Sequence, residues 1–146
     1  MFNAVFRTLI KQFVLLLLGI ILSMQAIATE FAVIVHPKNT SIFTAAKISR
    51  MFLSKIKSFD NGSPVEFYSY DFDTEIRQAF EAKILKKTPQ ELKSYWTKLV
   101  FTGKGSPPHT LGTDAEVIYQ VSKNPNGIGY IPIELVTPEV KVVYTY

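Results

Sequence analysis

Two polar turns in this sequence carry the side chains best suited to hold a ligand. Thr40 and Ser41 follow one apolar run, and Thr74 and Arg77 follow another, with Arg77 one helical turn beyond Thr74. Hydroxyl groups, an Arg side chain and the free N–H groups at the start of a helix can together bind a small oxyanion. In the alternative interpretation, the hydroxyls cap their helices and Arg77 is solvated. The first interpretation makes these four side chains the candidate ligand-binding residues.

Two carboxylates beside the second turn count against an anion. Asp71 and Asp73 precede Thr74, and their negative charge would repel phosphate. They could instead favour the dipole of the following helix or contribute to a cation site. A magnesium or calcium site needs several convergent oxygens, and an Asp-x-Asp pair alone does not supply them. We therefore predict no metal site and no cofactor.

No pair of residues suited to nucleophilic catalysis is visible. The sequence has no Cys, and no Ser, Asp or Glu is placed by sequence to make either of its two His, His36 and His109, a catalytic base. Lys104, which lies between two glycines, lacks the spacing of a phosphate-binding P-loop. The sequence therefore predicts a protein that is not an enzyme and has no catalytic residue.

The N-terminal segment has the three parts of a secretory signal. Basic residues precede an uninterrupted apolar run at residues 13–22, and Ala26 and Ala28 then form a small-residue cleavage pattern. The apolar run is shorter than the roughly 20 residues of a membrane-spanning helix. We predict a cleavable signal peptide at residues 1–28 and a periplasmic domain at residues 29–146. The alternative is an uncleaved membrane anchor.

The charge of the protein depends on that segment. The full sequence of 146 residues carries 16 Lys and Arg against 12 Asp and Glu, for a net charge of +4. Residues 29–146 keep 14 basic and 12 acidic side chains, for a net charge of +2. A charge this small does not predict nucleic-acid binding. We expect contact with a membrane only through the signal segment before cleavage.

Strand and helix patterns alternate after the signal segment. Apolar or alternating runs predict strands over residues 31–35, 65–70, 128–131 and 140–144. Helical spacing predicts a helix over residues 44–54, with Thr44 as its N-cap, and another over residues 75–85. Capping boxes at Thr88–Glu91 and Thr113–Glu116 open two more helices. In the helix after Thr88, Tyr95 and Trp96 are predicted to belong to the core.

This order of elements predicts an α/β domain. Strands separated by helices favour one layered lobe, with a mainly parallel or mixed sheet flanked by helices. The strand at residues 31–35 is apolar throughout, and we expect it to be buried on both faces, parallel and central.

A series of short motifs resembles a known family. The most telling one runs from Tyr95-Trp96 through Phe101-Thr102-Gly103-Lys104-Gly105 to Pro107-Pro108, and Gly127-Ile128-Gly129-Tyr130-Ile131 follows it. Earlier in the chain lie FAVIVHPKN at residues 31–39, ISRMFLSK at 48–55, DNGSPV at 60–65 and RQAF at 77–80. In this order, across nearly all of residues 29–146, the motifs resemble the short, single-lobe form of the phosphate ABC transporter substrate-binding-like proteins, in the periplasmic binding protein type II group.

The resemblance implies binding of phosphate or another small oxyanion outside the inner membrane, with a transporter or a sensor protein as partner. Full-length members close two lobes on the ligand, using Ser and Thr hydroxyls, helix N-terminal N–H groups and an Arg, and this chain corresponds to one lobe. It departs from the family pattern at Phe72-Asp73-Thr74, where full-length phosphate binders have Ser-Gly-Thr, and at Ser54 and Phe59, which replace Gly and Trp. The alternative function is a ligand-independent protein-interaction or signalling module with a vestigial pocket.

Overall fold

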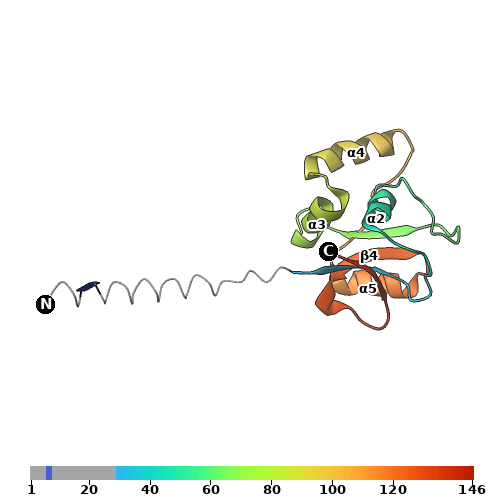
Figure 1. Cartoon of the computed structure of the whole chain (residues 1–146). Coiled ribbons are helices and arrows are strands. Elements are labelled where there is room, and N and C mark those ends of the chain that lie inside the picture. The colour runs from blue at the N-terminus through green and yellow to red at the C-terminus, as the bar shows by residue number, and fades with distance from the viewer. Residues whose placement is uncertain (1–5, 8–28) are drawn as a thin grey trace.

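The computed structural model describes residues 6–7 and 29–146 of the chain. Within these residues, helices cover both faces of a five-stranded sheet (Figure 1). The predicted signal segment lies outside the described residues, except for residues 6 and 7. Among the residues described, no helix combines the length and the apolar character needed to cross a membrane.

The sheet is mixed, which the predicted fold class includes. Its strands are β1 (Phe31–Val35), β2 (Glu66–Tyr70), β3 (His109–Leu111), β4 (Gly127–Pro132) and β5 (Lys141–Thr145), in the spatial order β3-β2-β4-β1-β5. β2 runs parallel to β3 and β4, whereas β1 runs antiparallel to both of its neighbours, β4 and β5. The prediction of a layered α/β domain is therefore confirmed.

The expectation that β1 is parallel is wrong. β1 is buried along its whole length, as predicted, but it pairs in the antiparallel sense on both sides. Burial on both faces requires only that helices cover both faces of the sheet, and it does not fix the direction of the strand. As a result, the carboxyl ends of β1 and β2 point in opposite directions, and the residues that follow these strands lie on opposite sides of the molecule.

The helices of the described residues match the predicted ones closely. They are α2 (Ala45–Phe52), α3 (Glu75–Phe80), α4 (Pro89–Phe101) and α5 (Asp114–Lys123), with a π-helical turn at Glu81–Leu85 that continues α3 and a 3-10 turn at Ile133–Leu135. In Figure 1, α5 lies on one side of the sheet, α2 and α3 lie on the other, and α4 lies beyond them. The sequence analysis did not predict the 3-10 turn or β3, a three-residue edge strand that pairs with β2.

Three of these helices begin at the predicted caps. The hydroxyls of Thr44, Thr88 and Thr113 accept hydrogen bonds from N–H groups in the first turns of α2, α4 and α5. Glu91 and Glu116 complete the two capping boxes by accepting from the backbone N–H of the capping Thr. These bonds satisfy N–H groups that have no partner within the helix, so the sequence alone fixes where these helices start.

The core on the α2 and α3 side is built around Tyr130 of β4. The ring of Tyr130 stacks on that of Phe80 with 4.0 Å between the ring centroids, and Phe52 of α2 packs edge-on against both rings. Trp96 of α4 is buried in this layer, as predicted. On the opposite face of β4, Gly129 lets α5 approach the sheet closely.

Candidate functional site

Thr74 and Arg77 lie at the edge of the sheet where β2, β3 and β4 end. Thr74 is the residue that precedes α3, and Arg77 lies in the first turn of that helix. The prediction that the second polar turn joins the end of a strand to the start of a helix is therefore confirmed. In α/β sheets, ligands bind at such positions, outside the carboxyl ends of the strands.

The guanidinium of Arg77 is enclosed by the protein. Only 4% of the residue is exposed. Its Nε donates to Oε1 of Glu81 at 2.7 Å, and its Nη1 donates to the backbone carbonyl of Tyr70 at 2.6 Å. The ring of Phe72 covers it, with 3.7 Å between Cζ and the ring centroid. The charge of Arg77 is thus balanced by Glu81, and Phe72 lies over the guanidinium.

The start of α3 differs from the other helix starts. The hydroxyl of Thr74 donates to the backbone carbonyl of Asp71 at 2.8 Å and makes no capping bond. The first-turn N–H groups of α3 therefore lack the side-chain acceptor that Thr44, Thr88 and Thr113 supply to the other helices. An uncapped helix start can offer its N–H groups to an anion.

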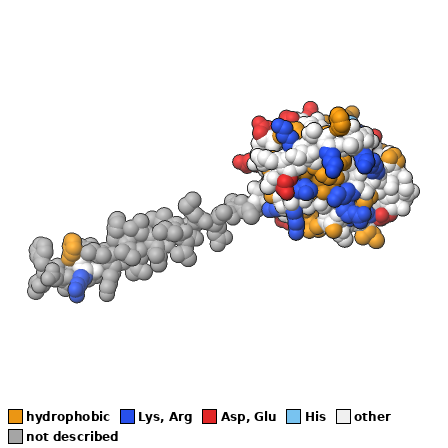
Figure 2. All heavy atoms as spheres, turned by 90° about the horizontal axis from the view of Figure 1, so that it is seen from above, with side chains coloured by type: hydrophobic (Ala, Val, Ile, Leu, Met, Phe, Trp, Pro, Cys, Tyr) orange, Lys and Arg blue, Asp and Glu red, His pale blue; other side chains and the backbone are white. Residues whose placement is uncertain are grey.

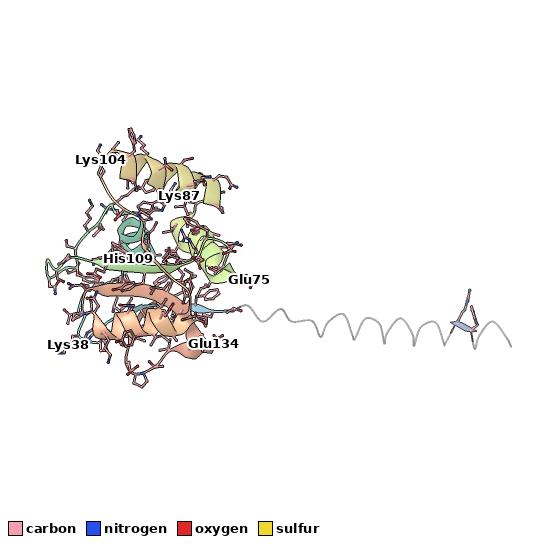
Figure 3. All side chains as sticks on the ribbon, turned by 180° about the vertical axis from the view of Figure 1, so that it is seen from behind. Lys38, Glu75, Lys87, Lys104, His109 and Glu134 are labelled. Atoms are coloured by element: carbon pink, nitrogen blue, oxygen red, sulfur yellow. The ribbon has the colours of Figure 1, made fainter. Side chains whose placement is uncertain are left out.

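Acidic side chains gather at this same edge. Figure 3 shows Glu75, which follows Thr74, and Glu134, which follows β4, on the same side of the molecule. The residues that we call the acidic edge are Asp71, Asp73, Glu75, Asp114, Glu116 and Glu134. The electrostatic field of these carboxylates opposes the approach of an anion to the start of α3.

A buried polar cluster lies beneath the acidic edge. The hydroxyls of Tyr130 and Ser69 hydrogen-bond to each other at 2.7 Å, and the hydroxyl of Tyr70 donates to Oδ1 of Asp114 at 2.7 Å. Burial raises the pKa of both tyrosines, and the neighbouring Asp114 raises that of Tyr70 further, so both hydroxyls stay protonated at neutral pH. The one sequence signal for this cluster was Ser69, a hydroxyl on the apolar face of the strand predicted at residues 65–70.

Thr40 and Ser41 lie at the opposite edge of the sheet. Because β1 is antiparallel to β4 and β4 is parallel to β2, the chain leaves β1 where β2 begins. Figure 3 shows the separation, since Lys38, just after β1, lies on the other side of the molecule from Glu75. The four predicted residues therefore form two separate pairs, and the structure does not bring them into one shared site.

Ser41 joins two loops at that opposite edge. Its backbone N–H donates to Oδ1 of Asn39 at 2.9 Å, and its hydroxyl accepts from the backbone N–H of Asp60 at 3.1 Å. Lys47 pairs with the carboxylate of Asp60 and lowers its pKa. Thr40 is exposed, and neither hydroxyl caps α2, because that helix begins several residues later.

A groove of about 300 Å³ opens at the same edge, beside the start of β2. Its lining includes Ser54, Lys57, Glu66 and His109. The Nζ of Lys57 donates to the backbone carbonyl of Lys104 at 2.8 Å, which holds the Lys side chain against the loop after α4. Because a Lys and a Glu both line the groove, its charges do not favour an anion over a cation.

The two imidazoles are engaged in local contacts. Nδ1 of His36 accepts from the backbone N–H of Lys38 at 3.1 Å, and the ring of His109 lies beside that of Tyr68. In residues 6–7 and 29–146, no hydroxyl or carboxylate is hydrogen-bonded to either imidazole, and no three His, Asp or Glu side chains converge on a point where they could hold a metal ion.

Comparison with known sequences finds no match, either among protein-family models or among curated proteins. Solved structures do match. A protein from Clostridium perfringens, described as a phosphate ABC transporter substrate-binding protein with bound phosphate, has a TM-score of 0.64 and 21% identity, over 79% of this chain and 45% of that chain. An ABC-type phosphate transport receptor from Vibrio cholerae has a TM-score of 0.62 and 15% identity, over 79% of this chain and 46% of that one. PstS from Borrelia burgdorferi has a TM-score of 0.57 and 14% identity, over 79% of this chain and 47% of that one.

These similarities establish the fold. The chain shares the α/β architecture of the matched part of phosphate-transport binding proteins, which is the fold that the sequence motifs implied. It spans less than half the length of each of these three proteins. At this level of identity, what the chain binds has to be argued from its own side chains.

Proposed function

We propose that residues 29–146 form a periplasmic, non-enzymatic module that binds a small oxyanion such as phosphate at the start of α3. The observation that carries the proposal is the uncapped start of this helix at the carboxyl end of β2, in a fold shared with a protein solved with bound phosphate. The first-turn N–H groups are the donors, and the hydroxyl of Thr74 becomes a further donor once its proton turns from the carbonyl of Asp71 to the anion. The predicted signal peptide accounts for delivery to the periplasm, where a transporter or a sensor protein is the partner.

We expect the start of α3 to bind an anion weakly, because the charged groups around it are unfavourable. Asp71 and Asp73 repel the anion across the same turn, and Arg77 reaches it only if Phe72 moves away from the guanidinium. We expect a dissociation constant for phosphate on the order of 1 mM.

Titration with inorganic phosphate tests the proposal. Thr74→Val removes the hydroxyl while keeping the shape of the side chain, and it should weaken binding about fivefold. Asp73→Asn removes a repelling charge and should tighten binding by a similar factor. Calorimetry, together with the line width of the phosphorus NMR signal, measures both changes.

A Thr on another helix provides the control for this titration. Thr97→Val makes the same substitution on α4, at an exposed Thr that is outside the acidic edge, and it should leave phosphate binding unchanged. The proposal is contradicted if neither the wild type nor Asp73→Asn binds phosphate at about 10 mM, where a millimolar site would be largely filled.

The enclosure of the Arg77 guanidinium by its neighbours favours a second function. This function is a ligand-independent interaction or signalling module with a vestigial pocket. The guanidinium is bonded to Glu81 and Tyr70 and covered by Phe72, so it stabilises the lobe without any ligand. Phe72→Ala separates the two functions, because it uncovers the guanidinium at an exposed position. Tighter phosphate binding by this variant supports the oxyanion site, whereas no phosphate binding by either protein supports the interaction module.

A further inference from the structure

The side of α4 that faces away from the rest of the protein is both apolar and basic. The inner side is buried through Leu92 and Trp96, and the hydroxyl of Tyr95 ties it to the backbone at the end of α2 with a 2.6 Å hydrogen bond. On the outer side, Phe101 is 92% exposed and Val100 is 56% exposed. A shallow hollow there is lined by the residues that we call the α4 outer face, namely Lys93, Ser94, Thr97, Lys98 and Phe101.

The spacing of these residues places them on one stripe of the helix. Residues 93, 97 and 101 recur every four positions, and residue 98 lies three positions before 101, so all four share a side of α4. Phe101 therefore lies on the same side of α4 as Lys93 and Lys98, at the C-terminal end of the stripe. Figure 2, which views the molecule from above with α4 toward the viewer, shows Lys and Arg side chains around exposed hydrophobic ones.

The basic charge of the domain is concentrated on and beside α4. Residues 86–104 contain five Lys and one Glu, for a net charge of +4, whereas the rest of residues 29–146 contains nine basic and eleven acidic side chains, for a net charge of −2. Figure 3 shows Lys87 and Lys104 at the two ends of the helix. Within the described residues, none of the five Lys forms an ion pair. The single acid, Glu91, is occupied by the capping box of α4.

We propose that the α4 outer face binds the surface of an anionic phospholipid membrane. An exposed helix with an aromatic side chain between lysines has the chemistry of an interfacial amphipathic helix. A planar anionic surface can meet Lys on both sides and at both ends of α4 at once, while Phe101 enters the headgroup region. An acidic protein partner would need a pocket for its anchoring side chains, and the hollow on α4 is shallow.

This membrane contact is separate from the proposed oxyanion site. The acidic edge and the α4 outer face are formed by different residues with opposite charge. The inference departs from the expectation that only the signal segment meets a membrane. Because the two sites do not share residues, loss of phosphate binding and loss of membrane binding are distinguishable in the same set of variants.

Flotation with lipid vesicles tests the proposal. The protein used comprises residues 29–146, since every strand and core residue described above lies within them and the apolar N-terminal segment would itself enter vesicles. It should float with vesicles that contain roughly one third phosphatidylglycerol, and not with pure phosphatidylcholine vesicles. Adding about 0.5 M salt should release it, because the attraction is electrostatic. Protein expressed from the full sequence and recovered from the periplasm provides a second sample.

Two variants with matched controls locate the surface. Lys93→Gln with Lys98→Gln should lower binding about 25-fold, or about fivefold per Lys, whereas Lys38→Gln with Lys123→Gln, elsewhere on the surface, should lower it far less. Phe101→Ser should weaken binding, and the control Tyr119→Ser, which also replaces an exposed aromatic, should not. All six positions are exposed, and circular dichroism confirms that each variant is folded.

The outcomes divide clearly. Binding to anionic vesicles that depends on Lys93, Lys98 and Phe101 supports the proposal. Absence of wild-type binding at low salt overturns it, as does a loss that is equal in the α4 variants and their controls. Capture of an acidic protein through the α4 outer face, without vesicle binding, also overturns it in favour of a protein partner.

Discussion

What each polar side chain near the acidic edge can bind depends on how deeply it is buried and on what it contacts. Arg77 was predicted from its type and from its distance to Thr74, but the structure places it in an ion pair with Glu81 and beneath the ring of Phe72. Both charged residues of the pair are 4% exposed, so removing either one would leave a buried charge without a partner. Thr74 keeps the predicted position, and it differs from the other Thr at helix starts because its hydroxyl does not cap α3.

Tyr146 shows the opposite case, a buried hydroxyl without a partner. Its ring packs against Phe31 and Phe80, but its hydroxyl makes no hydrogen bond within the described residues. Tyr146→Phe keeps the ring and removes the unsatisfied group, and it should raise the free energy of unfolding by about 0.5–1 kcal/mol. Urea denaturation at neutral pH measures this change. Tyr119→Phe, at an exposed position, should have no effect.

The same substitution should change how stability depends on alkaline pH. Burial raises the pKa of Tyr146 above its ordinary value of 10.0, so in the folded protein it keeps its proton when the unfolded chain has lost it. Well below pH 10 the hydroxyl is protonated in both the folded and the unfolded state, so its titration does not affect stability. As the pH rises through about 10, only the unfolded chain loses this proton, and stability falls. Tyr146→Phe should therefore lose less stability than the wild type between about pH 9 and pH 11. Equal losses in the two proteins would show that Tyr146 does not titrate on unfolding.

At the scale of elements, local signals decide where helices start and close packing decides how they meet the sheet. The capping Thr residues act within one turn, and they lie where the sequence predicts them. The contact between α5 and β4 depends instead on a Gly. A Cβ at Gly129 would lie 2.7 Å from Cγ1 of Val117, a distance that side chains do not tolerate without a shift.

Gly129→Ala should therefore destabilise the domain by about 2 kcal/mol, because the added methyl group pushes α5 away from the sheet. Gly112→Ala is the control, since its Cβ would meet only Oε2 of Glu116 at 3.5 Å, and it should change stability by less than about 0.5 kcal/mol. Adding Val117→Ala to Gly129→Ala should recover part of the loss. Chemical denaturation gives all the values, and an unchanged Gly129→Ala protein would show that α5 is not packed this closely.

At the scale of the whole molecule, charge is divided between two surfaces. The acidic edge surrounds the start of α3, and the lysines lie on and around α4, beyond α2 and α3. A net charge of +2 for residues 29–146 conceals this separation. The carboxylates around the proposed oxyanion site repel an anion, whereas the lysines of the proposed membrane surface attract an anionic one.

The predicted signal peptide leads to a prediction for the molecule as a whole. Exported protein should begin at Thr29, and mass spectrometry of periplasmic protein measures this directly. A protein that starts at Thr29 should melt within about 2 °C of the full chain, because the sheet and the core lie within residues 29–146. Leu17→Lys interrupts the apolar run and should block export. Recovery of a longer N-terminus from the membrane fraction would instead indicate an uncleaved anchor.

The sequence by itself determined the features that depend on neighbouring residues. The helix starts, the buried strand at residues 31–35, the buried Trp96 and the α/β order follow from caps and from apolar periodicity, which operate over a few residues. The ordered motifs added the fold itself, which solved structures bear out.

Only the tertiary structure decided how these elements face one another. Strand direction is set by pairing between distant segments, and the antiparallel β1 moved Thr40 and Ser41 to the edge opposite Thr74. The ring of Phe72 covers the guanidinium of Arg77, and Phe101 is exposed because the core covers the other side of α4. These features cannot be predicted from side-chain type and spacing along the chain, because each depends on contacts between segments that folding brings together.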